Sequence, residues 1–154
     1  MNKNVKIKSC CLKADELNNN NRIYPLKEVE KVYNNLKNNA IPITLDFPSS
    51  DGFIPPEIIC GKVSKVYMEN NNLWIEGEIC SENFSVASNI VNDMLSNNIS
   101  LYCCSFGVGD INEKNEVYDY DIKGVALYPE CAFDIKPLEI INEEENEPNI
   151  NWKI

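Results

Sequence analysis

The stretch Asn20-Asn21-Arg22-Ile23-Tyr24-Pro25 joins a polar segment to the first predicted helix. Proline suits the first turn of a helix, because a backbone N–H at that position would have no partner within the helix. From Leu26 to Leu36, apolar side chains recur at the spacing of one helical face. The sequence therefore predicts a helix near residues 26–38 that packs one face against a core.

Alternating and short apolar segments on both sides of this helix predict strands. The three asparagines 70–72 separate two apolar segments, a pattern typical of a β-hairpin with a short turn. The last two predicted strands are expected to lie side by side. The predicted strands cover residues 5–12, 41–45, 58–69, 73–80, 99–108 and 117–127.

A second helix is predicted at residues 86–97, with Ser85 as its N-cap. The apolar residues expected on its inner face are Val86, Ile90, Val91, Met94 and Leu95. Residues 46–57 are rich in proline, serine and glycine, so that a loop is expected there.

The order of these elements, with strands predominating, predicts an α+β fold. We expect a mostly antiparallel sheet or open barrel flanked by two helices. Residues 1–133 are predicted to form one domain, since a chain of 154 residues is of single-domain size. Residues 134–154 contain Glu143-Glu144-Glu145 and lack periodicity, which favours an exposed acidic extension.

The formal net charge of −10 argues against direct binding to nucleic acid, which requires clustered lysine and arginine. The same charge would suit a basic protein partner or a mimic of DNA, although plain solubility is the simpler interpretation. No apolar segment approaches the roughly 20 residues of a membrane span, and no secretory segment is recognised. We therefore expect neither a membrane nor a secreted location.

Seven cysteines raise the question of disulfides or a metal site. Their number is odd, and their spacing fits no small disulfide scaffold. The chain has no histidine and no C-x-x-C pair, both of which are common in zinc sites. We expect seven reduced thiols, no metal and no cofactor.

Three segments resemble, in order, the catalytic motifs of the T4-type phage prohead core protease family. They are residues 20–25 (NNRIYP), 43–48 (ITLDFP) and 103–109 (CCSFGVG). The corresponding family motifs typically read N-G-R-x-Y-P, G-E-L-x-H-P and S-S-R-G-x-G. Further similarity lies in residues 63–67, 76–79, 87–98 and 124–133. The resemblance covers about residues 12–133 and implies a prohead-protease-like fold.

The resemblance also implies that the catalytic site is degenerate. The family takes its general base from the histidine of the second motif and its nucleophile from the serines of the third. Phe47 stands at the histidine position and Phe106 at the arginine position, while Cys104 and Ser105 match the two serines. A serine or thiol without an adjacent base is a weak nucleophile, so we expect no peptidase activity. Asp46 could act as a base from the same loop, but capping its own turn is the favoured interpretation.

The aromatic replacements suggest a different use for the former catalytic cleft. Phe47 and Phe106 are expected to lie near each other, where they either close the cleft or convert it into an apolar recognition pocket. We take Asp46, Phe47, Phe106 and Gly107 as candidate binding residues. Gly107 would serve backbone geometry there rather than chemistry.

Three functional hypotheses follow. The first is a non-catalytic phage or prophage protein that binds a head or scaffold protein during capsid assembly. The second is an active capsid-maturation protease that uses Cys104 or Ser105. The third is a small acidic phage effector that inhibits a host enzyme. All three place the chain in the cytoplasm of a bacterial host, the first also admits a place in the virion, and a homo-oligomer stays open.

Overall fold

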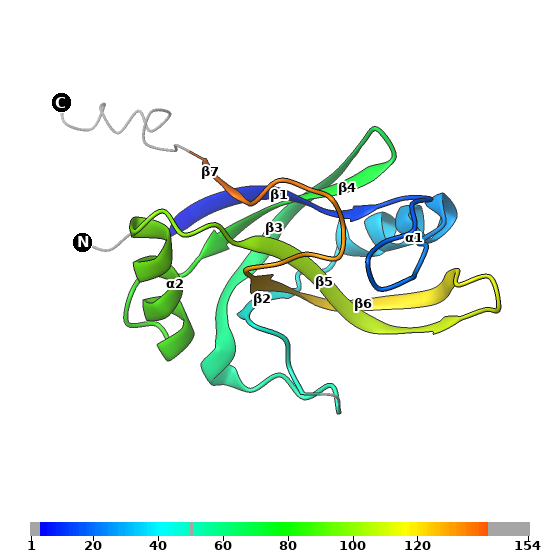
Figure 1. Ribbon diagram of the computed structural model, residues 1–154. Helices are drawn as coiled ribbons and strands as arrows, with labels where there is room; N and C mark the ends of the chain where they lie inside the picture. The colour runs from blue at the N-terminus through cyan, green and yellow to red at the C-terminus, as the bar shows by residue number, and fades with distance from the viewer. Residues whose placement is uncertain (1–3, 50, 142–154) are drawn as a thin grey trace.

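The computed structural model describes residues 4–49 and 51–141, which form one curled sheet and two helices (Figure 1). The predicted α+β fold is confirmed. In chain order the elements are β1 (Val5–Lys13), α1 (Leu26–Leu36), β2 (Pro42–Leu45), the short 3-10 helix η1 (Pro56–Ile58), β3 (Ile59–Glu69), β4 (Asn72–Ile79), α2 (Val86–Ser96), β5 (Tyr102–Ile111), β6 (Val117–Tyr128) and β7 (Glu139–Ile141).

The sheet has seven strands in the order β5-β6-β2-β3-β4-β1-β7. Neighbouring strands are antiparallel except β2 and β6, which run parallel with Ile43 opposite Val125. β1 also contacts β5, so the sheet curls toward an open barrel. The two helices lie toward opposite ends of this curled sheet (Figure 1).

The core lies inside the curl and beneath the two helices. Period-two alternation places Leu73, Ile75 and Ile79 of β4 on the inner face, where all three are fully buried. On α1, Val29 and Val32 contribute the facing surface. Burying each such aliphatic side chain contributes about 1.5–3 kcal/mol, which is what holds the helix on the sheet.

The hairpin between β3 and β4 follows from its asparagines. Asn70 and Asn71 both have positive φ, at 52° and 66°. A two-residue turn with both residues left-handed matches the twist of the flanking strands, and asparagine tolerates that conformation well. The predicted hairpin is confirmed, with the strands meeting at Glu69 and Asn72.

The motif before α1 folds as a loop that organises the start of the helix. Asn21 stands where the related motif has glycine, and its φ of 60° is one that asparagine tolerates better than most residues. The Asp15 carboxylate accepts a hydrogen bond from the Leu26 N–H at 3.0 Å. A residue from the preceding loop thereby caps the helix that begins after Pro25.

Ser85 caps α2 as predicted. Its hydroxyl accepts from the Ser88 N–H at 2.9 Å, and the Ser88 hydroxyl accepts from the Ser85 N–H at 2.9 Å. This reciprocal pair is a capping box in which a serine occupies the third helical position. Two backbone N–H groups of the first turn are satisfied in this way.

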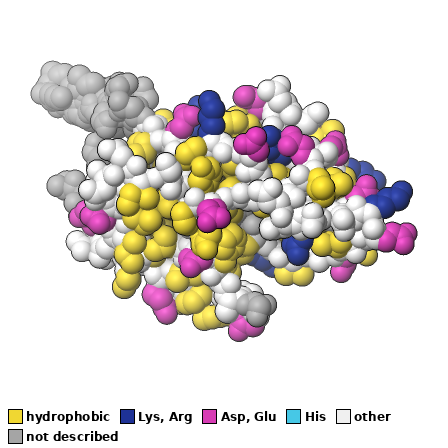
Figure 2. Space-filling view, in the orientation of Figure 1, with side chains coloured by type: hydrophobic (Ala, Val, Ile, Leu, Met, Phe, Trp, Pro, Cys, Tyr) yellow, Lys and Arg dark blue, Asp and Glu magenta, His cyan; other side chains and the backbone are white. Residues whose placement is uncertain are grey.

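The inner face of α2 was predicted wrongly in part. Val86 and Ile90 are exposed, at 64% and 42%, whereas Ala87, Ser88 and Val91 are buried. The small side chains of Ala87 and Ser88 let the helix lie close to the sheet. A prediction based on large apolar residues overlooks both of them. Hydrophobic side chains accordingly gather on the molecular surface over α2, on the left in Figure 2.

Two boundaries also differ from the prediction. β5 begins at Tyr102 rather than residue 99, because Asn98 turns the chain with a φ of 59°. Residues 134–141 belong to the predicted extension, yet Leu138 donates a backbone hydrogen bond to Leu101 O at 2.8 Å, and β7 pairs with β1. Residue 133 is therefore not the limit of the sheet, and the glutamates 143–145 lie outside the described residues.

Candidate functional site

A cavity of about 310 Å³ opens where five segments converge, and several of the predicted site residues line it. It is bounded by the end of β1, the loop before α1, the loop after β2, β5, and the segment that follows β6. The lining residues are Cys11, Asn18, Asn19, Asn20, Tyr24, Phe47, Cys104, Ser105, Tyr128, Glu130, Cys131, Ala132 and Phe133. All three segments of the family resemblance therefore reach the same cavity.

Phe47 and Phe106 lie near each other, as predicted. Their ring centroids are 6.5 Å apart in an edge-to-face arrangement, and Phe47 also lies 5.4 Å from the ring of Tyr128. Phe47 lines the cavity and is 43% exposed, so the two aromatic rings leave the cleft open. The apolar edge of the cavity at Phe47 is therefore available to a ligand.

Gly124 of β6 leaves the space that the Phe106 ring occupies. A Cβ atom on Gly124 would collide with the Phe106 ring and would lie 3.1 Å from Pro42 O. The absence of a side chain at this position lets the Phe106 ring pack against β6. Phe106 supports Phe47 in this way, although it does not line the cavity itself.

Gly107 serves backbone geometry, as expected, and does not line this cavity. The pairing of β5 with β6 shifts register between Phe106 and Gly107. An added Cβ at Gly107 would collide with the carbonyl of Asp121 and lie 2.8 Å from the Ile122 Cα. The two strands approach so closely at this bulge that only glycine fits.

Asp46 stabilises its own turn. The residue has a φ of 69°, and its carboxylate accepts from the Phe47 N–H at 2.7 Å. The Thr44 hydroxyl donates to the carbonyl of Asp46 at 2.8 Å. Asp46 is not among the lining residues, so its geometry matches the capping role rather than that of a base.

Ser105 is paired with a tyrosine rather than with a base. Its hydroxyl lies 3.1 Å from the hydroxyl of Tyr120, which is only 7% exposed. Burial raises the pKa of Tyr120, and the nearby Tyr24 raises it further. Tyr120 therefore stays protonated at neutral pH and cannot accept the proton of Ser105.

Cys104 shares the cavity wall with a second thiol, Cys131, that no sequence pattern indicates. The Cys104 thiol lies 3.5 Å from the carbonyl of Glu130, and Cys131 follows Glu130 in the same cavity wall. Contact with Cys104, and then the nearby backbone N–H groups of Phe133 and Ala132, lower the pKa of Cys131 against the effect of burial. The same contact, with burial, raises the pKa of Cys104. No spacing rule links these two cysteines, which lie on separate segments.

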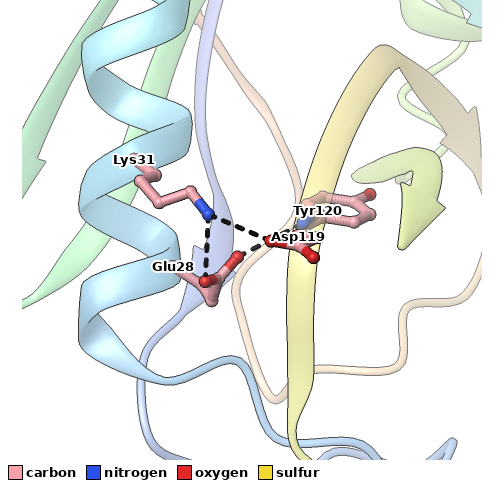
Figure 3. Close-up of polar contacts among 4 residues, drawn as sticks. All are labelled: Glu28, Lys31, Asp119 and Tyr120. Atoms are coloured by element: carbon pink, nitrogen blue, oxygen red, sulfur yellow. Dashed lines mark hydrogen bonds and ion pairs between the residues drawn. The ribbon is translucent and has the colours of Figure 1, made fainter. Parts of the chain in front are cut away.

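A carboxylate behind the site joins α1 to β6 (Figure 3). Glu28 is 7% exposed, and its Oε1 accepts from the Tyr120 N–H at 3.2 Å. Lys31 lies 3.3 Å from the other oxygen of Glu28 and 3.8 Å from Asp119. Asp119 has a φ of 54° at a bulge opposite Gly109, and this bulge turns the Tyr120 N–H away from β5 toward the helix.

Within residues 4–49 and 51–141, no group of three or more metal-binding side chains is placed to hold an ion. All seven cysteines are free in the structure. Over the same part of the chain, every helix is too short or too polar to cross a membrane.

Comparison with known proteins identifies the fold. No protein-family profile matches the sequence, and no curated protein matches it. Among solved structures, the chain is similar to the bacteriophage T4 capsid assembly protease, gp21, with a TM-score of 0.72 and 16% identity over 80% of each chain. The fold is prohead-protease-like. At this identity the likeness establishes the architecture alone, and it confirms the fold implied by the three sequence motifs.

Proposed function

We propose that this chain is a non-catalytic phage or prophage protein that acts in head assembly by binding another protein at the cavity. The observation that carries the proposal is the fold shared with a T4 capsid assembly protease, combined with a cavity whose histidine position is Phe47. The proposed partner is a head or scaffold protein of the same phage. The proposed place of action is the cytoplasm of the bacterial host.

The chemistry around the cavity supports a non-catalytic role. The chain contains no histidine, and the hydroxyl of Ser105 is paired with the protonated Tyr120. Cys104 is buried with a raised pKa, so it is a poor nucleophile at neutral pH. Loss of a positioned base alone costs about 10²–10⁴-fold in rate.

The same surface supports protein binding. Phe47 is partly exposed beside Tyr128, and aromatic side chains at the rim of a cavity are frequent anchors in protein interfaces. Asparagines 18–20 also line the cavity and offer amide groups for hydrogen bonds with a peptide backbone. The net charge of −10 favours a partner segment that carries lysine or arginine.

The test combines binding and cleavage. The purified chain is mixed with the major capsid and scaffold proteins of the same phage, and complexes are followed by size-exclusion chromatography. We expect a complex, intact partner masses, and about tenfold weaker binding by Phe47→Ala. Phe53→Ala is the matched control, because Phe53 is 63% exposed but lies away from the cavity.

Two results would overturn the proposal. Cleavage of a head protein that disappears in Cys104→Ala or Ser105→Ala would establish an active protease instead. Failure of every head and scaffold protein to bind, with a correctly folded chain, would exclude the assembly role.

A further inference from the structure

Three large apolar side chains lie exposed at the N-terminal half of α2. Val86 and Ile90 are about one turn apart on the same face of the helix, with exposed fractions of 64% and 42%. Phe84, just before the N-cap, is 60% exposed, and none of the three lines the cavity. We call these three residues the α2 patch; Figure 2 shows hydrophobic side chains gathered over this helix.

The local fold does not account for the exposure of Phe84. A hydrophobic residue just before an N-cap commonly packs against the fourth residue of the helix. In α2 that fourth residue is Asn89, whose side-chain oxygen instead accepts a hydrogen bond from the Asn83 N–H at 2.6 Å. Phe84 therefore has no apolar partner at that position, and its ring stays on the surface.

The segments around the α2 patch carry carboxylates but no basic side chains. Residues 53–61 and 81–101, which contain η1, α2 and their flanks, include no lysine or arginine. Glu82 lies just before the patch, and Glu57 belongs to η1, which packs against α2. Both glutamates are exposed, and among the residues that the structure describes neither forms an ion pair.

The C-terminal end of α2 is electrostatically unbalanced. Asp93 is exposed in the last turn, three residues after Ile90 and therefore on the same side of the helix. The carbonyl end of a helix carries a partial negative charge, and no basic residue occupies this turn. The Asp93 carboxylate thus lowers the stability of the free helix, and a cation supplied by another molecule would relieve the repulsion.

We propose that the α2 patch docks an amphipathic helix of a partner protein, whose apolar face is bordered by lysines or arginines. Val86 and Ile90 form a ridge of the kind that packs between the side chains of a second helix. The basic edges of that helix would lie near Glu57, Glu82 and Asp93, while its apolar face contacts the patch. This surface is separate from the cavity, so the inference does not rest on the proposed function.

Size and charge decide between such a helix and the alternative occupants. The three apolar side chains expose on the order of 300 Å², whereas a standard interface buries about 800 Å² on each partner. The patch therefore suits one helix and a weak, transient complex. A second copy of the chain would bring the same acidic edges against each other. Residues 142–154 contain four glutamates and one lysine, so charge also opposes docking by the chain's own C-terminal segment.

The test uses the full chain and a fluorescein-labelled helical peptide of about 18 residues, with leucine on one face and lysine along both edges of that face. Fluorescence anisotropy measures the dissociation constant. Val86→Ser should weaken binding about fivefold, and Phe84→Ser combined with Val86→Ser at least about tenfold. Val108→Ser is the matched control, because Val108 is 63% exposed in β5, and it should leave the affinity unchanged.

Two further measurements test the contribution of charge. Asp93→Asn should weaken binding about two- to fivefold at low salt. The same substitution should leave the urea midpoint unchanged or higher, because the free helix loses an unfavourable charge, and this separates lost binding from lost folding. A peptide with glutamate in place of lysine should not bind, and neither should one with serine in place of leucine.

Several results would overturn the proposal. Equal affinities of Val86→Ser and Val108→Ser would place the peptide on another surface, and a wild type that does not bind the peptide would exclude the docking site. Undiminished binding of the leucine-free peptide would reduce the attraction to net charge alone. A dimer of the free chain in sedimentation equilibrium that dissociates in Val86→Ser would make a second copy the occupant instead.

Discussion

Replacing Glu28 tests how α1 is attached to the sheet behind the cavity. The bulge at Asp119 turns the Tyr120 N–H away from β5, and Glu28 is its acceptor at 3.2 Å. Glu28→Ala leaves this N–H buried without that partner, because Tyr120 is only 7% exposed. The substitution also removes the ion pair between Lys31 and the carboxylate of Glu28.

The magnitude follows from these two losses. An unpaired buried N–H costs about 1–3 kcal/mol. The ion pair with Lys31, which is half exposed, adds at most about 1 kcal/mol. We therefore expect Glu28→Ala to lower the free energy of unfolding by about 1–4 kcal/mol, and Glu28→Gln, which keeps an acceptor oxygen, by at most about 1 kcal/mol.

Urea unfolding, monitored by tryptophan fluorescence and far-ultraviolet circular dichroism, measures these differences if the m-value is unchanged. Glu30→Ala is the control, because Glu30 is an exposed glutamate on the same helix and should change stability by less than about 0.5 kcal/mol. Equal losses for Glu28→Ala and Glu28→Gln would refute the argument. So would a loss for Glu28→Ala as small as that of Glu30→Ala.

Two further predictions concern thiol protonation and helix capping. Burial raises the pKa of Cys60 and Cys103 from 9.0 to about 12, so the folded chain holds both protons where the unfolded chain releases them. This contribution to the free energy of unfolding should be fully present below pH 9.0 and should fall as pH rises toward about 12, by about 1.4 kcal/mol per pH unit for each thiol. Urea midpoints measured at increasing pH under reducing conditions test this. A midpoint independent of pH would contradict it. Ser85→Ala removes the acceptor for Ser88 N and should cost about 1–2 kcal/mol in urea unfolding. Ser96→Ala, at the other end of the helix, is its control, and equal small effects of the two would rule out the capping argument.

The parts of the fold that depend on neighbouring residues could be predicted from sequence. The asparagine turn between β3 and β4 and the Ser85 cap both arise from short-range hydrogen bonds and backbone preferences. The proximity of Phe47 and Phe106 was predictable only through the family resemblance. Composition and periodicity place those two residues on separate segments and give no distance between them.

The parts that were missed depend on contacts between distant segments. Glu28 reads as a solvated glutamate in the first turn of a helix, and only the bulge in β6 gives it a buried partner. Cys131 acquires its environment from Cys104 and from a bend in its own loop. The three residues of β7 are too few for a recognisable alternation, so their pairing with β1 is visible only in the structure.

The parallel pairing of β2 with β6 has a consequence for the order in which the chain folds. β2 is hydrogen-bonded to β6, although β3, β4, α2 and β5 are all synthesised between the two strands. Contacts between such distant segments form slowly, because a long loop must be closed before they contribute stability. During translation, β1, β3 and β4 can associate early, while β2 keeps one edge unpaired until β6 has left the ribosome. We expect the cavity to be the last part to form, and N-terminal fragments that stop before β6 to be prone to aggregation.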